Sequence, residues 1–298
     1  MIYNTILDAI GHTPMIKLNK LSNPDDAQIL VKYEGVNIGG SIKTRTAYNM
    51  LKCAEESGLI HENTIIVEPT SGNQGIGIAL VGAVKGYKVK IIMPDSVSEE
   101  RRKLVQNDGD IGACIAECMA TAERMAKENP NVYIPGQFEN PNNPKVHIYH
   151  TAAEILEQVG GDIDGFCSGV GTGGTISGIG EVLKKQNPAI KIWAVEPENA
   201  AILSGGAIGT HLQMGIGDGL IPENLNTRIY DNICLVSDEE AIATAKRLAS
   251  EEGIMCGISS GSNVAAAIKL AKRLGKGKTV VTVLPDTGER YFSTILFD

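Results

Sequence analysis

The chain has 298 residues, a formal net charge of −8 and 43% hydrophobic residues, a size that suits one large domain or two of medium size. Its acidic balance argues against a nucleic-acid partner, and it has neither an apolar run long enough to span a membrane nor a signal-peptide pattern. The six Cys are scattered, without the spacing of a zinc site or a disulfide framework. We therefore expect a cytoplasmic globular protein with no metal, no nucleic-acid partner and no membrane partner.

Short β-rich runs alternate with longer helical stretches along the chain. The expected strands are 29–33, 64–67, 88–93, 165–167, 191–195, 233–236 and 279–284, and the expected helices are 42–56, 74–85, 98–106, 114–128, 150–159, 175–186, 238–252 and 262–274. This alternation predicts an α/β fold with mostly parallel sheet covered by helices on both faces. Ser237 precedes three acidic residues and is typical of a helix N-cap. The Pro- and Asn-rich stretch 133–144 predicts a connector between two lobes.

The first of four Gly-rich loops is 37–43, Asn-Ile-Gly-Gly-Ser-Ile-Lys. Ser41 is a candidate cap for the helix that follows, and Lys43 falls in its first turn. There the positive end of the helix dipole disfavours a protonated amine, which suits a Schiff-base lysine. A surface lysine after a loop is the alternative.

The second loop, 68–75, links a strand to an apolar helix. Thr70, Ser71 and Asn73 offer more polar groups than one helix cap requires, so this loop predicts a carboxylate or phosphate cradle. An ordinary capped turn is the alternative.

The third loop, 168–175, is the strongest phosphate candidate, because Gly-rich backbone amides and two Thr hydroxyls meet a helix start. Gly169, Gly171 and Gly174 also match a dinucleotide-binding fingerprint, and Glu196 lies 22 residues beyond Gly174, near the expected position of a ribose-binding acid. An NAD-binding module is therefore a serious rival at this point.

The fourth loop, 256–263, again precedes a helix. Ser259 or Ser260 could donate a hydrogen bond to a ring nitrogen or a phosphate. Taken alone, the simpler interpretation is that they cap a helix beginning at Ser262.

Together the four loops favour a lysine-bound cofactor with a single phosphate. Such a cofactor needs a phosphate cradle, a lysine, a substrate-carboxylate loop and a partner for its ring nitrogen, which predicts pyridoxal 5′-phosphate. A dinucleotide enzyme uses one Gly-rich loop and leaves the lysine unexplained. An NAD-dependent or non-catalytic binding module stays as the second hypothesis.

The motifs resemble those of the cysteine synthase (O-acetylserine sulfhydrylase) family, relatives of cystathionine β-synthase among the tryptophan-synthase-β-like pyridoxal-phosphate enzymes. The resemblance runs over nearly the whole chain and in the same order, through IGHTPMIKL (10–18), NIGGSIK (37–43), EPTSGNQG (68–75), GQFENPNNP (136–144), SGVGTGGTISG (168–178), AVEP (194–197), HLQMGIGDG (211–219), GISSG (257–261) and VTVLPDTGERY (281–291). It implies fold type II, two twisted open sheets flanked by helices with the cofactor in the cleft. The implied lobes are a small mobile lobe, 47–147, that carries the substrate-carboxylate loop, and a larger cofactor-binding lobe, 1–46 plus 148–298.

The resemblance also implies a role for each motif. Lys43 would form the internal aldimine and later remove the Cα proton. Asn73 would bond the ring hydroxyl of the cofactor, and Ser259 its ring nitrogen. The implied phosphate cradle is Gly171, Thr172, Gly173, Gly174 and Thr175, and the implied substrate-carboxylate site is Thr70, Ser71, Gly72, Asn73, Gln74 and Gln137. Glu196 then has a structural or allosteric role.

The implied chemistry is β-replacement on a serine- or cysteine-type amino acid through an aminoacrylate. A neutral hydroxyl at the ring nitrogen keeps the electron sink moderate, so charge leaves through the β-substituent. The leading reaction is cysteine synthesis from O-acetyl-L-serine and sulfide. The alternatives are sulfide release from L-cysteine with water giving L-serine, and formation of lanthionine or cystathionine. The family usually forms homodimers, and some members bind a serine acetyltransferase tail.

Three departures from the family pattern stand out. Gln74 replaces a common Thr in the substrate loop. Asp218 replaces a small apolar residue. Its carboxylate could act as a general base on water or hold the substrate amine, which would favour the cysteine-consuming direction. A solvated loop Asp without a catalytic role is the alternative. The segment 106–114 is shorter than in relatives.

Overall fold

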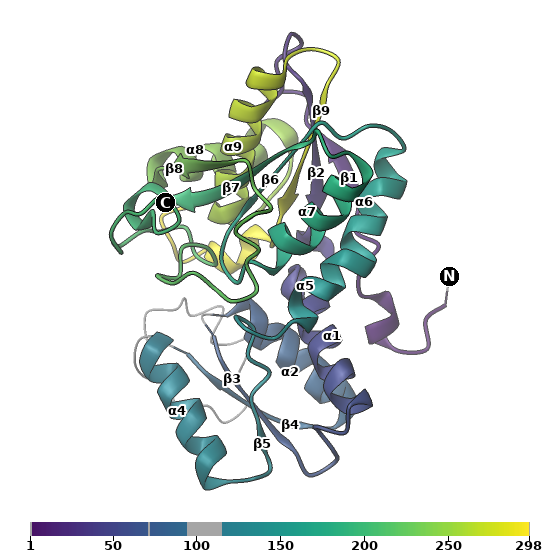
Figure 1. Cartoon of the computed structure of the whole chain (residues 1–298), viewed down its shortest axis with the longest axis vertical. Helices are drawn as coiled ribbons and strands as arrows, with labels where there is room; N and C mark the ends of the chain where they lie inside the picture. Colours follow the sequence, from purple (N-terminus) through teal and green to yellow (C-terminus); the bar gives the residue numbers. More distant parts are fainter. Residues whose placement is uncertain (1, 71, 94–114, 298) are drawn as a thin grey trace.

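The computed structural model describes residues 2–70, 72–93 and 115–297, which form two sheets with their helices (Figure 1). The helix expected at 98–106 and the short segment 106–114 lie outside the described residues. Within the described part, no helix is long and apolar enough to cross a membrane.

The larger sheet has six strands in the order β1-β2-β9-β6-β7-β8. Every neighbouring pair is parallel except β1 and β2, which confirms the predicted α/β class. The strands are β1 (Met15–Lys17), β2 (Gln28–Tyr33), β6 (Gly165–Gly169), β7 (Lys191–Pro197), β8 (Asn232–Val236) and β9 (Thr279–Leu284). All six residues of β9 are buried, as expected for an interior strand covered on both faces.

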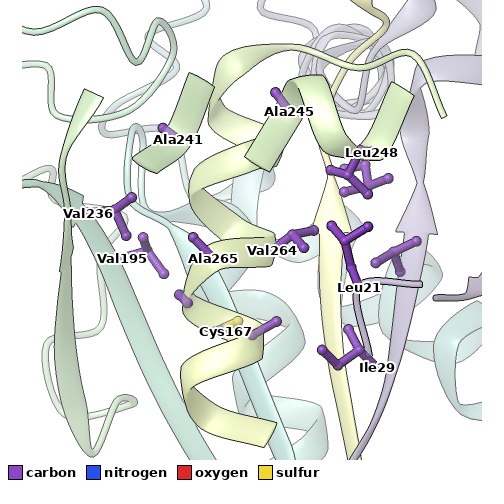
Figure 2. Close-up of a cluster of buried hydrophobic side chains, with 14 of the residues drawn as sticks. Leu21, Ile29, Cys167, Val195, Val236, Ala241, Ala245, Leu248, Val264 and Ala265 are labelled. Atoms are coloured by element: carbon purple, nitrogen blue, oxygen red, sulfur yellow. The ribbon is translucent and has the colours of Figure 1, made fainter. Parts of the chain in front are cut away.

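Alternate residues of these strands supply two hydrophobic cores, one on each face of the sheet. One core joins Cys167 and Val280 to helices α8 (Asp238–Glu252) and α9 (Ile258–Leu274). Figure 2 shows residues of this core, among them Leu248 of α8, Val264 of α9 and Val195 of the sheet. The other core joins the neighbouring residues Phe166 and Val281 to helices α6 (Ala152–Val159) and α7 (Gly174–Gln186).

The smaller sheet has the parallel order β4-β3-β5. Its strands are β3 (Ile65–Pro69), β4 (Lys88–Ile92) and β5 (Val132–Tyr133). Helices α1 (Lys43–Glu56) and α2 (Asn73–Lys85) pack on one face through Ile66 and Ile91, and α4 (Ile115–Glu128) packs on the other through Val67 and Ile92.

Helix α5 (Asn142–Val146) contacts both α1 and α7, and the π-helical turn His147–Thr151 leads from it into α6. The chain therefore passes from the small sheet to the large one through this segment (Figure 1). The division into lobes at 47 and 147 stays a prediction. Short 3₁₀ turns complete the described elements at Ile6–Ala9, Glu34–Val36, Ile38–Gly40, Glu198–Ala200 and Gly288–Tyr291.

Most predicted elements lie within three residues of their observed bounds. Ser237 caps α8 as expected, since its side chain accepts from the Glu240 amide. Two predictions need correction. The short strands β1 and β5 were not expected, and α9 begins at Ile258, four positions before the predicted start at Ser262.

A buried ion cluster fixes the start of α1 against the large sheet and α6. Arg45 pairs with Glu34 at 2.9 Å and with Glu154 at 2.6 Å, and Lys32 reaches Glu154 at 2.7 Å. Buried charges are stable only when they are paired and hydrogen-bonded in this way. Since Arg45 lies two positions after Lys43, the cluster also fixes the backbone that carries this lysine.

Candidate active site

A pocket of about 900 Å³, part of it open to solvent, lies where β6 and β9 end and the smaller sheet's α2 begins. The crevice outside the carboxyl ends of parallel strands is the usual ligand site of open α/β sheets. Residues from all four Gly-rich loops line it: Lys43, Thr70, Asn73, Gln74, Gln137, Gly171, Thr172, Gly173, Thr175, Asp218 and Ser259. The structure thus brings together nearly all of the predicted site residues.

Lys43 is the first residue of α1, and its amine lies 3.5 Å from the Thr172 hydroxyl across the pocket. Burial lowers the pKa of this amine, while the nearby carboxyl groups of Asp218 and Glu68 raise it in opposition. A buried amine with a lowered pKa is the form that attacks a carbonyl carbon.

Ser41 does not cap α1, contrary to the prediction. The N-cap residue is Ile42, and the Ser41 hydroxyl is buried with no hydrogen-bond partner among the described residues. The backbone around Ser41 instead forms an isolated antiparallel bridge to Asp286, and the Ile42 amide donates to the Pro285 carbonyl at 2.9 Å. Pairing with the end of β9 therefore sets the approach to the lysine.

The third loop brings the backbone close to two neighbouring segments. An added Cβ at Gly171 would clash with the Gly215 carbonyl, and one at Gly174 would clash with the Asn143 side chain. Gly173 precedes α7 with φ +78°, a conformation that favours glycine. The free amides at the start of α7 are thereby presented to the pocket, as an anion site requires. Gly174 itself packs against Asn143 and does not line the pocket.

The fourth loop differs from the simpler prediction. Because α9 begins at Ile258 after an N-cap Gly257, Ser259 and Ser260 lie in its first turn and do not cap a helix at Ser262. Ser259 lines the pocket. Ser260 is fully buried and its hydroxyl lacks a hydrogen-bond partner within the described part of the chain.

The second loop turns sharply before α2. Gly72 has φ 147° and its amide donates to the Thr70 hydroxyl at 3.3 Å. Thr70 and Gln74 line the pocket, Gly72 does not, and Ser71 lies outside the described residues. Gln74 is 1% exposed, and neither end of its amide finds a hydrogen-bond partner in the described ranges. An unpaired buried amide is costly, so Gln74 is poised for a ligand.

Gln137 is held by its backbone carbonyl, which accepts from Asn143 at 2.7 Å and from Asn224 at 2.9 Å. Asn143 also donates to the Thr172 hydroxyl at 2.9 Å. Asn143 thereby connects the substrate-carboxylate candidates to the phosphate loop. The sequence did not predict this role, although Asn143 belongs to the Pro- and Asn-rich connector.

Asp218 lies in the pocket and is half-buried there. Burial raises the pKa of its carboxyl group, opposed by the charges of Lys43 and His211. The His211 ring is held by the Gly217 carbonyl at 3.0 Å, next to Asp218 in the chain. A buried carboxyl group beside a reactive amine is typical of proton-transfer sites.

Glu68 is a second buried carboxyl group near Lys43, and the sequence analysis assigned it no role. Burial raises its pKa to about 8, and the nearby charge of Lys43 lowers it in opposition. The signal in the sequence was its place at the end of a buried strand, just before the substrate loop.

Glu196 binds within its own loop. Its carboxylate accepts from the amides of Leu203 and Ser204 and from the Ser204 hydroxyl. With its oxygens engaged in this way, Glu196 is not presented to a ribose, which removes the main support for the dinucleotide interpretation.

Fold and pocket together define an α/β protein with a half-buried lysine facing a glycine-rich loop in a pocket between two sheets. Residues 6–286 match the family model described as "Pyridoxal-phosphate dependent enzyme". The chain belongs to this family.

Similar proteins narrow the class within the family. The cysteine synthase of Staphylococcus aureus is 50% identical over 300 residues, 99% of this chain and 97% of that protein. The crystal structure of a hydrogen sulfide-producing enzyme from Fusobacterium nucleatum is 39% identical with a TM-score of 0.92, over 97% of this chain and 100% of that chain. That of an O-acetylserine-dependent cystathionine beta-synthase from Helicobacter pylori is 35% identical with a TM-score of 0.94, over all of both chains.

The residues of the pocket fit pyridoxal phosphate, the cofactor of this family. The amine of Lys43 is buried with a lowered pKa, and the glycines of the third loop let backbone amides come close enough to hold a phosphate. The hydroxyl-bearing Ser259 sits at the start of α9 on the pocket wall. The lysine, the glycine-rich loop and the serine thus each present an uncharged or hydrogen-bond-donating group to the pocket.

Replacing Glu68 by Gln tests the raised pKa. Folding shifts this pKa upward from an ordinary 4.5 to about 8, so the folded state holds the proton more tightly than the unfolded chain. The free energy of unfolding should therefore fall as the pH rises between these two values, by at most about 1.4 kcal/mol per pH unit. Gln mimics the protonated acid. The free energy of unfolding of Glu68→Gln, measured by urea unfolding between pH 5 and 8, should therefore change less with pH than that of the wild type.

The exposed Glu62→Gln, on the loop before the same strand, is the matched control and should keep the wild-type slope. Equal slopes in Glu68→Gln and the wild type would show that Glu68 ionises normally.

Proposed function

We propose that this enzyme carries out β-replacement on a serine- or cysteine-type amino acid, and that its main reaction forms L-cysteine and acetate from O-acetyl-L-serine and sulfide. The observation that carries the proposal is the half-buried Lys43 amine, whose pKa is lowered, in one pocket with a glycine-lined loop and a separate polar loop. The likeness to cysteine synthases over nearly the whole chain supports it.

The cofactor would be held by the four loops. The amine of Lys43 would bind it covalently, the loop from Gly171 to Thr175 would hold its phosphate, and Ser259 would face its ring nitrogen. When bound, pyridoxal phosphate supplies an electron sink for the negative charge that develops at Cα. The Lys43 amine would accept the Cα proton and return it after the new bond to the β-carbon has formed.

The substrate carboxylate would bind between Thr70, Gln74 and Gln137. The unpaired Nε2 of Gln74 supplies a donor that an ionised carboxylate satisfies. Because Gln137 is anchored by Asn143 and Asn224, substrate binding would also connect the small sheet to the large one. We infer that the small lobe, 47–147, closes over the site and excludes water when the carboxylate binds.

Sulfide release from L-cysteine is the second candidate reaction, and Asp218 is the observation that favours it. In this direction the thiol leaves the β-carbon as sulfide and water adds, giving L-serine. The buried Asp218 carboxylate lies beside Lys43, where it would accept the proton of that water. Lanthionine or cystathionine formation would replace water by the thiol of a second amino acid.

We further propose that the enzyme is a cytoplasmic homodimer and that a serine acetyltransferase tail binds it. These proposals rest on the family resemblance, together with exposed apolar side chains near the N-terminus, Ile2 and Ile6, that a partner subunit would cover.

The first test is the visible spectrum of the purified protein, before and after adding O-acetyl-L-serine, with L-cysteine measured after sulfide is supplied. We expect a yellow protein whose spectrum changes with O-acetyl-L-serine and which forms cysteine. Lys43→Ala should lose the covalent chromophore and slow turnover by about 10²–10⁴-fold, since it removes both attachment and proton transfer. A colourless wild-type protein would contradict the proposal.

Asp218→Ala separates the two candidate reactions. If Asp218 activates water, sulfide release from L-cysteine should fall about 10²-fold or more, while cysteine formation from O-acetyl-L-serine and sulfide changes only a few-fold. Sulfide and L-serine are quantified for the first reaction, and L-cysteine for the second. Asp218→Asn keeps the shape but removes the basic carboxylate, so it should behave like Asp218→Ala; unchanged sulfide release in both variants would refute the role.

Gln74→Ala should raise the KM for O-acetyl-L-serine about tenfold, because a hydrogen bond to a charged group is lost. The KM for sulfide should stay constant, since sulfide carries no carboxylate. Steady-state kinetics with each substrate varied in turn gives both values. An equal rise in both would indicate a general disturbance of the pocket instead.

A further inference from the structure

The segment 285–291 between the end of β9 and the C-terminus has no role in the function described so far, yet it contacts three of the four Gly-rich loops. The Ile42 amide donates to Pro285 and the Thr287 amide donates to Gly40. On the other side, Cys256 and Thr287 form an isolated bridge. The segment is therefore packed between the loop that precedes Lys43 and the loop that precedes α9.

Two side chains of this segment engage the second loop, at the start of α2, through Asn73. The Nδ2 amide of Asn73 donates to Asp286 at 2.7 Å, and its Oδ1 accepts from the guanidinium of Arg290. Arg290 also donates to the Gly39 carbonyl, and the Tyr291 hydroxyl donates to Asp286 at 2.8 Å. All three partners are buried. The side-chain amide of Asn73 is thus held at both ends.

The chemistry of these partners permits one orientation of the Asn73 amide. A guanidinium has donors only, so it must face the oxygen of Asn73, and an ionised carboxylate has acceptors only, so it must face the nitrogen. A flipped amide would place oxygen against carboxylate and nitrogen against guanidinium. The charges of Asp286 and Arg290 therefore set the orientation of the Asn73 amide before any ligand binds.

A fixed amide has a consequence for the pocket. Asn73 lines the pocket, and its nitrogen carries two hydrogens, of which Asp286 takes one. The second is left to donate to an oxygen of a bound molecule. The pocket wall at this point therefore offers a donor, never an acceptor.

We propose that Asp286, Arg290 and Tyr291 are positioning residues that fix Asn73 as a hydrogen-bond donor to the ring oxygen of the cofactor. The proposal rests on the proposed function, which assigns Asn73 to that oxygen. None of the three lines the pocket, so they would act through Asn73. They also couple its position to the loop before Lys43, because Arg290 holds Asn73 and Gly39 at once.

The test uses the holoenzyme variants Asp286→Ala, Tyr291→Phe and Asn73→Ala, with two readouts besides activity. One is the apparent dissociation constant of pyridoxal phosphate, and the other is the ratio of the long- and short-wavelength absorption bands of the bound cofactor. Asp286→Ala should weaken cofactor binding about tenfold and shift the band ratio, because the Asn73 nitrogen loses its carboxylate partner and the amide is then held at its oxygen end alone. Tyr291→Phe should shift both readouts in the same direction by less.

A double-mutant cycle separates positioning from a general structural role. If Asp286 acts through Asn73, then Asp286→Ala should change neither readout further in the Asn73→Ala background. Additive effects in the double variant would overturn the proposal. Glu289→Gln, an exposed change in the same turn, is the matched control and should leave the band ratio unchanged.

The role of Asn73 and the role of its positioning residues can be refuted separately. An unchanged spectrum and affinity in Asn73→Ala would remove the assignment of Asn73 to the cofactor, on which the proposal rests. If the spectrum and cofactor affinity change in Asn73→Ala but not in Asp286→Ala and Tyr291→Phe, the assignment of Asn73 stands and the positioning role is refuted. Tyr291→Phe keeps the buried ring, so it gives a result even where Asp286→Ala does not fold.

Discussion

Under the proposed function, the rest of the site depends on the uncharged state of the half-buried Lys43 amine. Lys43 can attack a carbonyl carbon only as a neutral amine, and burial lowers its pKa toward that state. Two carboxyl groups, Asp218 and Glu68, work against it, because ionised carboxylates would stabilise the ammonium form. Burial raises the pKa of both, so the same low-polarity environment favours the neutral form of all three groups.

Close backbone approach is the second requirement, and it explains the glycines. The phosphate loop must fit between the backbone at Gly215 and the Asn143 side chain, where a Cβ at Gly171 or Gly174 would clash. Asn143 then uses this proximity to bind both Gln137 and Thr172. The same residue, Asn143, therefore leaves no room for a side chain at Gly174 and connects Gln137 to the third loop.

The sequence predicted those parts of the structure that local patterns determine. Continuous apolar runs such as β9 identify interior strands, and Ser237 marks a helix start. Strands β1 and β5 are too short to show a period. The start of α9 was mistaken for a loop because Gly257 and Gly261 favour turns, whereas Gly261 packs against the Ala241 carbonyl of α8 and needs to be small. Asn73 and Asp286 are 213 positions apart, so no local pattern could show that they meet.

Asp218 gives the two candidate reactions a common physical basis. Its carboxyl group lies near Gly171 on the wall of the pocket. Under the proposed function, sulfide needs no base to attack the β-carbon, whereas water does. A protonated Asp218 would therefore leave sulfide as the effective nucleophile, and an ionised Asp218 would admit water. Because burial and the charges of Lys43 and His211 act on this pKa in opposite directions, the proposed function makes the protonation of Asp218 the step that would select between cysteine formation and sulfide release.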